Sequence, residues 1–227
     1  MKRNKLDVDY WKESVHTLFS YWSCVLAIGI ELFLGLRHLD ELFGQLCIME
    51  ALFGLSGILL LDPIHGKKKL YPEVFKKIHP DSLFRFAVIF GIIALIQFVF
   101  QIIPLITSTE MALAIAFCPV CEEYFFRGIM MEPFFKAGRD APKDERIKLW
   151  KDREITYWEI FGILFSGLLF AIFHINYYGN PNLIFMVMFG GSWFALTYWY
   201  WKDLTAVILA HFLLNIIFIV QFYEVFL

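Results

Sequence analysis

The sequence predicts an all-α polytopic membrane protein, a transmembrane helix bundle of about seven spans. Apolar residues make up 59% of its 227 residues, against about 45–50% in an average soluble domain, and the mean hydropathy is +0.61. The apolar residues form long unbroken runs that lack the alternation of a membrane barrel. This much apolar surface exceeds what one water-soluble core of this length can bury. The lipid bilayer is therefore an expected partner.

Each expected span is an apolar run of about twenty residues, long enough to cross a hydrocarbon core roughly 30 Å thick. A basic, polar segment precedes the first run and no small-residue cleavage site follows it, so we expect a retained signal anchor. Residues 1–82 are expected to form an N-terminal two-span region with a basic cytoplasmic loop, and residues 83–227 a second region. The expected spans are Thr17–Leu36, Leu42–Leu61, Leu83–Ile103, Met111–Phe135, Trp158–Ile175, Leu183–Tyr200 and Leu204–Phe222.

The placement of lysine and arginine predicts the orientation in the membrane. With the N-terminus in the cytoplasm, eighteen of the twenty basic residues fall in cytoplasmic segments, while Arg37 is external and Arg127 lies within a span. The prediction is therefore N-in and C-out, for an integral multi-pass protein of the cell membrane if the source is prokaryotic. The polar loops Asp62–Ser82 and Lys136–Tyr157 are then cytoplasmic. For the second loop we expect an interfacial helix on the headgroups, with a gate or docking surface as the alternative.

Charged residues inside the fourth expected span are the first functional candidates. A charge at mid-membrane is unfavourable by roughly 2.5–3.5 kcal/mol on insertion scales, so such residues are functional by default. Glu123 and Arg127 are four residues apart, share a helix face and can form an ion pair. Glu122 is rotated by about 100° from Glu123 and needs a different partner. A purely structural charge cluster explains the pair but leaves Glu122 unexplained.

Two histidines and an asparagine lie within other expected spans. His174 is in the fifth span, where Phe170 lies on the same helix face, four residues earlier. His211 and Asn215 are four residues apart in the seventh span and also share a face. A single buried histidine is usually a satisfied core residue. Two histidines, an asparagine and an unpaired glutamate on three spans instead predict one polar cavity within the membrane.

These three segments, CPVCEEYFFRGIMMEP, GLLFAIFHINYYG and LTAVILAHFLLNIIF, resemble the signatures of the CPBP (Abi) family of intramembrane proteases. That family includes type II CAAX prenyl endopeptidases and immunity-associated membrane proteins. Its pattern is Glu-Glu-x-x-x-Arg, Phe-x-x-x-His and His-x-x-x-Asn, in that order on separate helices, and every named position is matched. The resemblance covers roughly Ser82 to Phe222, so residues 83–227 are expected to be the catalytic core, and it leaves the first two spans unexplained.

The resemblance implies a glutamic intramembrane endopeptidase of the CAAX-processing type. Glu122 with His174 would activate a water, His211 and Asn215 would hold the oxyanion, and Glu123 with Arg127 would support the site structurally. The implied substrate is a protein or peptide, prenylated or not.

The same residues allow three alternative interpretations. Glu122, His174 and His211 are sufficient for a catalytic zinc, although the expected cofactor is none. A non-catalytic immunity or scaffold protein of the membrane is the alternative from another class. Redox chemistry at Cys118 and Cys121 is disfavoured, because they lie inside an apolar helix with no preceding strand. The net charge of −2 gives no general attraction to nucleic acid, and none is expected as a partner.

Overall fold

The structure is a computed structural model, and it describes residues 80–100, 109–149, 153–174 and 183–226. Most of these residues are helical, which confirms the helical part of the predicted fold class. The first two expected spans lie outside the described residues, as do Glu31, Glu50, Cys24 and Cys47. The number of spans and their orientation therefore stay predictions.

Each of the other five expected spans contains a helix. The principal helices are α5 (Pro80–Phe100), α6 (Thr109–Glu123), α8 (Tyr157–Phe173), α9 (Leu183–Trp201) and α10 (Leu204–Phe226). Among the described residues, α5 and α9 are long and apolar enough to cross a membrane, judged by length and composition. Large apolar side chains of α5 are exposed, among them Leu83, Phe84, Phe98 and Val99, and this helix therefore needs an apolar surrounding.

The fourth expected span is wrong as one continuous helix. After α6 the backbone continues as a π-helix, η2 (Tyr124–Ile129), in which the Met130 N–H donates to the Phe125 carbonyl at 2.9 Å. The chain bends at 130–131 before the short helix α7 (Glu132–Asp140). A π-turn widens the helix by one residue, and such turns occur often at functional sites. Apolar length alone did not reveal this break, although Gly128 before the bend and Pro133 after it are residues that disfavour a continuous helix.

The expected interfacial helix of the second polar loop is wrong beyond Asp140, where α7 ends. A 3₁₀ turn η3 (Lys143–Glu145) follows α7 and leads into a hairpin of β1 (Arg146–Lys148) and β2 (Glu154–Thr156), paired antiparallel. Helix α8 begins directly after the hairpin, and a capping box stabilises its first turn. The Thr156 side chain accepts from the Glu159 N–H, and the Glu159 side chain accepts from the Thr156 N–H. The mixed positive and negative residues of this loop did not distinguish these short strands from a helix.

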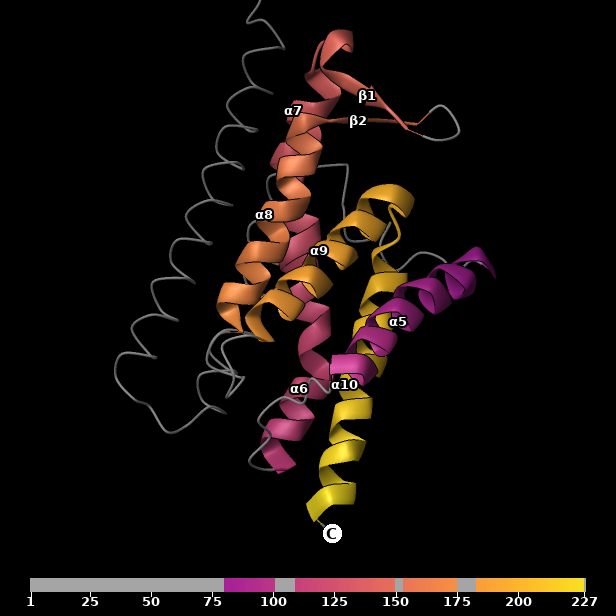
Figure 1. Ribbon diagram of the computed structural model, residues 1–227, viewed down its shortest axis with the longest axis vertical. Helices are drawn as coiled ribbons and strands as arrows, with labels where there is room; N and C mark the ends of the chain where they lie inside the picture. Colours follow the sequence, from indigo (N-terminus) through magenta and orange to yellow (C-terminus); the bar gives the residue numbers. More distant parts are fainter. Residues whose placement is uncertain (1–79, 101–108, 150–152, 175–182, 227) are drawn as a thin grey trace, which may run out of the picture.

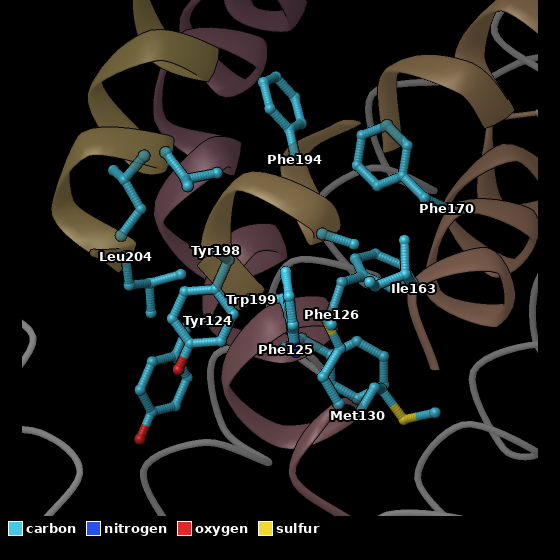
Figure 2. Close-up of a cluster of buried hydrophobic side chains, with 14 of the residues drawn as sticks. Tyr124, Phe125, Phe126, Met130, Ile163, Phe170, Phe194, Tyr198, Trp199 and Leu204 are labelled. Carbon is cyan, nitrogen blue, oxygen red and sulfur yellow. The ribbon is translucent and has the colours of Figure 1, made fainter. Parts of the chain in front are cut away.

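Helices α8 and α9 pack closely because each has a glycine at the crossing. A Cβ added to Gly167 would collide with Ser192, and one added to Gly191 would lie 2.9 Å from Cβ of Phe170. Phe170 of α8 and Phe194 of α9 both belong to the buried hydrophobic cluster and lie in the upper part of Figure 2. The missing side chain at Gly191 therefore permits this close packing.

Helix α10 runs between α5 and α6 (Figure 1). Its first turn is held by Asp203, which accepts from the Ala206 N–H at 3.0 Å and receives hydrogen bonds from Ser82 and Arg85 of α5. The β1–β2 hairpin and the C-terminus lie at opposite ends of the molecule (Figure 1). Helix α6 enters from the end that holds the C-terminus, so α6 and α10 run antiparallel.

Candidate active site

The site begins with an ion pair at the end of α6. Nε of Arg127 lies 3.1 Å from Oε2 of Glu123, and neither side chain is exposed to solvent. The spacing of four residues that predicted this pair is retained although Arg127 lies in the π-helix η2. Two opposite charges at 0% exposure stabilise each other, because removal of either leaves the other buried without compensation.

Aromatic rings and a backbone carbonyl complete the surroundings of Arg127. Its Nη2 donates to the Gly191 carbonyl of α9 at 2.9 Å. Its guanidinium carbon lies 4.7 Å from the ring centre of Phe170, and Phe126 and Phe194 are also within cation–π distance. Arg127 therefore joins η2 to α8 and α9 at one point.

His211 on α10 contacts both glutamates. Its Nδ1 lies 2.8 Å from Oε1 of Glu123, a hydrogen bond between buried groups, and its Nε2 lies 3.6 Å from Oε2 of Glu122. The ring also packs on Phe194, with centres 5.2 Å apart. Glu123 thus has two partners, Arg127 and His211, of which the sequence predicted the first.

His174 ends α8 and completes the surroundings of Glu122. Its Nε2 lies 3.8 Å from Oε1 of Glu122, and its Nδ1 lies 2.7 Å from the Phe170 carbonyl. Phe170 lies on the same helix face, as expected, and its ring packs against that of His174 with centres 4.3 Å apart and planes tilted by 33°. The backbone of His174 has φ −101° and ψ 3°, the bridge conformation in which many active-site residues are found.

The hydrogen-bond partners fix which ring nitrogen carries the hydrogen. A carbonyl oxygen can only accept, so Nδ1 of His174 donates to Phe170. An ionised carboxylate likewise only accepts, so Nδ1 of His211 donates to Glu123. When neutral, both imidazoles therefore present an unprotonated Nε2 to Glu122. The carboxylate and these nitrogens are all acceptors, and a donor between them would relieve their repulsion.

Asn215 lies one turn further along α10 and has different partners. Its Nδ2 donates to the Ile115 carbonyl of α6 at 2.8 Å and lies 3.6 Å from the sulfur of Cys118. The structure therefore gathers Glu122, His174 and His211 around one point, and it holds Asn215 against an earlier turn of α6.

The geometry around Glu122 is looser than that of a zinc site. Two ligands of a tetrahedral zinc with bonds of about 2.0–2.1 Å are separated by about 3.3 Å, whereas the contacts of Glu122 are 3.6 and 3.8 Å. Among the described residues, no group of three or more His, Cys, Asp or Glu side chains is arranged to hold a metal ion. The zinc alternative is therefore left to experiment.

Sequence reasoning missed several contributors to this site. The Gly191 carbonyl, the Ile115 carbonyl and the Phe194 ring each contact a motif residue. Backbone carbonyls leave no trace in a motif, and Phe194 is one of 26 phenylalanines in the chain. The position of Pro119, four residues after Ile115, is the one signal that could have indicated a free carbonyl.

Comparison with known proteins gives a family. The family model described as Type II CAAX prenyl endopeptidase Rce1-like matches residues 104–217, just over half of the chain, and all three motifs fall inside the match. No curated protein and no solved structure gave a match. The members of this family are membrane-embedded endopeptidases of the CAAX-processing type. On this match, the chain belongs to the type II CAAX prenyl endopeptidase Rce1-like family.

Proposed function

We propose that this protein is an intramembrane endopeptidase that cleaves a peptide bond with a water activated by Glu122 and His174. One observation carries the proposal: the Glu122 carboxylate faces Nε2 of both His174 and His211, at 3.8 and 3.6 Å. Polar contacts longer than 3.5 Å are commonly bridged by water. A water donates two hydrogens, and the carboxylate and an unprotonated Nε2 are the two acceptors that it needs.

The proposed reaction uses Glu122 as general base and then as general acid. Glu122 takes a proton from the water as the water oxygen attacks the scissile carbonyl carbon. The carbonyl oxygen becomes an oxyanion, which His211 and Asn215 stabilise by donating hydrogen bonds. The C–N bond then breaks and Glu122 gives its proton to the departing amine. No step needs a metal or another cofactor.

Glu123 supports this reaction through His211. A carboxylate hydrogen-bonded to Nδ1 of an imidazole orients the ring and stabilises its charged form. In the charged form, Nε2 of His211 carries a hydrogen and can donate to the oxyanion. Arg127 forms an ion pair with Glu123 at 3.1 Å and keeps this carboxylate in place. Glu123 and Arg127 are therefore positioning residues in the proposal.

The family description supports a substrate that ends in a prenylated CAAX sequence. The test is cleavage of a farnesylated CAAX peptide by the purified protein, together with mass spectrometry of peptide termini in cells that express wild type or Glu122→Gln. We expect release of the last three residues by wild type alone. If the same peptide termini are found in cells that express wild type and in cells that express Glu122→Gln, and the purified protein does not cleave the peptide, the scaffold alternative is favoured instead.

We also propose the predicted arrangement of seven spans with the N-terminus inside. The positive residues around Lys148 and the opposite placement of the hairpin and the C-terminus (Figure 1) support it. Single cysteines placed at Lys148 and Tyr178 in intact cells test it with an impermeant thiol reagent. Labelling at Tyr178 alone is expected, and labelling at Lys148 alone would contradict the orientation.

A further inference from the structure

A proline interrupts the hydrogen bonding of α6 one turn before the glutamates. Pro119 lies inside α6 and is fully buried. Proline has no backbone N–H, so the carbonyl four residues earlier, that of Ile115, loses its helical donor. A buried carbonyl without a donor is unfavourable, so another group is needed to satisfy it.

Two side chains supply that group. Nδ2 of Asn215 donates to the Ile115 carbonyl at 2.8 Å, and the Cys118 thiol donates to the same oxygen from 3.1 Å. The amide nitrogen of Asn215 has two hydrogens, and it also lies 3.6 Å from the Cys118 sulfur. Sulfur is a weak acceptor. Before substrate binds, the Cys118 sulfur can therefore accept the second hydrogen of Asn215, and it competes only weakly with an oxyanion for this hydrogen.

The spacing links this contact to the proposed catalytic centre. Cys118 precedes Glu122 by four residues on α6, and Asn215 follows His211 by four residues on α10. Because the two helices are antiparallel, the pairs Glu122–His211 and Cys118–Asn215 form successive contacts along one face, 3.6 Å across in each case. Four residues of helix separate them by about 6 Å.

We propose that Cys118 and Pro119 are positioning residues for Asn215. Pro119 frees the Ile115 carbonyl, this carbonyl anchors one amide hydrogen of Asn215, and Cys118 aims the other hydrogen. An oxyanion formed at the neighbouring Glu122–His211 contact takes the second hydrogen in place of sulfur. This role rests on the proposed function of Asn215, and it gives a purpose to two residues beside the motif that the proposed reaction does not otherwise use.

The test compares matched variants on a farnesylated CAAX peptide. Cys118→Ala is expected to lower kcat by less than the ~10²–10³-fold that is typical for loss of a whole oxyanion donor. KM should stay unchanged. Cys118→Ser keeps a hydroxyl that can donate to Ile115 and accept from Asn215, so it should restore most of kcat. Cys121→Ala is the control for loss of a thiol beside the motif, because Cys121 is half-buried whereas Cys118 is buried.

A double-mutant cycle separates positioning from packing. In an Asn215→Ala background, Cys118→Ala and Pro119→Ala should lower kcat no further, because the group that they position is gone. Full additive losses would overturn the proposal, as would equal activity of Cys118→Ala and wild type.

The same cycle measured on melting temperature needs no activity. If wild type cleaves the peptide no faster than Glu122→Gln, the proposed function fails, and the melting temperatures then decide the anchoring alone. Non-additive losses for Cys118→Ala and Asn215→Ala would support the shared anchor at Ile115. Additive losses would overturn it.

Discussion

Two adjacent glutamates of one helix have opposite surroundings in this protein. Glu123 is fully enclosed, with a hydrogen bond of 2.8 Å to His211 and an ion pair of 3.1 Å with Arg127. Glu122 has two imidazole neighbours, but both lie beyond hydrogen-bond distance, at 3.6 and 3.8 Å. One buried carboxylate is therefore tightly bound by protein groups and the other is loosely held.

In the proposed function, this difference allows one site within the membrane to hold buried charge and still react. A fully paired buried carboxylate is a structural element, because breaking its contacts exposes an uncompensated charge. A loosely held carboxylate can accept a proton and release it, as a general base must. His211 contacts both and connects the two glutamates.

The largest effect is expected at His174, on the loosely held side. His174→Ala removes the second acceptor that orients the proposed water, so cleavage of a farnesylated CAAX peptide should fall below detection. Phe173→Leu on the same turn is the matched control, and it should keep measurable activity. Activity of His174→Ala comparable to the control would assign the water to Glu122 and His211 alone.

Arg127 gives the next effect, on the enclosed side. Arg127→Met leaves the buried Glu123 without its cation and should lower the free energy of unfolding by roughly 3–5 kcal/mol, seen as low folded yield and early thermal unfolding. Arg139→Met is the control, because its partner Glu132 forms an exposed pair, which contributes little. Equal stability of the two variants would contradict the enclosed role.

A metal chelator should have the smallest effect. The proposed water activation uses protein groups alone, so the purified protein should bind no stoichiometric zinc and keep its activity in excess chelator. One zinc per chain, with activity lost on chelation and restored by zinc, would move Glu122, His174 and His211 into the ligand role.

The spacing of residues along one helix predicted the local contacts of the site. The ion pair of Glu123 with Arg127 and the ring contact of Phe170 with His174 follow from intervals of four residues on a helix. The contact of His211 with Glu123 joins residues 88 positions apart, and no local rule specifies it. It depends on how α10 packs against α6.

Backbone geometry limited the prediction of the fold. Apolar length located the helices, but it did not indicate the π-helix η2 or the β1–β2 hairpin. Except for Gly128, the π-helix consists of residues that are also common in α-helices, so composition did not distinguish it from an α-helix. The hairpin strands are three residues each, shorter than a periodic pattern can reveal.

The most direct test of the division between the two glutamates is a paired comparison of Glu122→Gln and Glu123→Gln. Both substitutions remove one carboxylate and keep the side-chain shape, and both proteins are assayed for melting temperature and for cleavage of a farnesylated CAAX peptide. Glu122→Gln is predicted to melt no earlier than wild type and to lose cleavage by at least the ~10²–10⁴-fold of a general base. Glu123→Gln is predicted to melt markedly earlier. If Glu122→Gln melts as early as Glu123→Gln, or retains cleavage, the two carboxylates do not divide chemistry and structure between them.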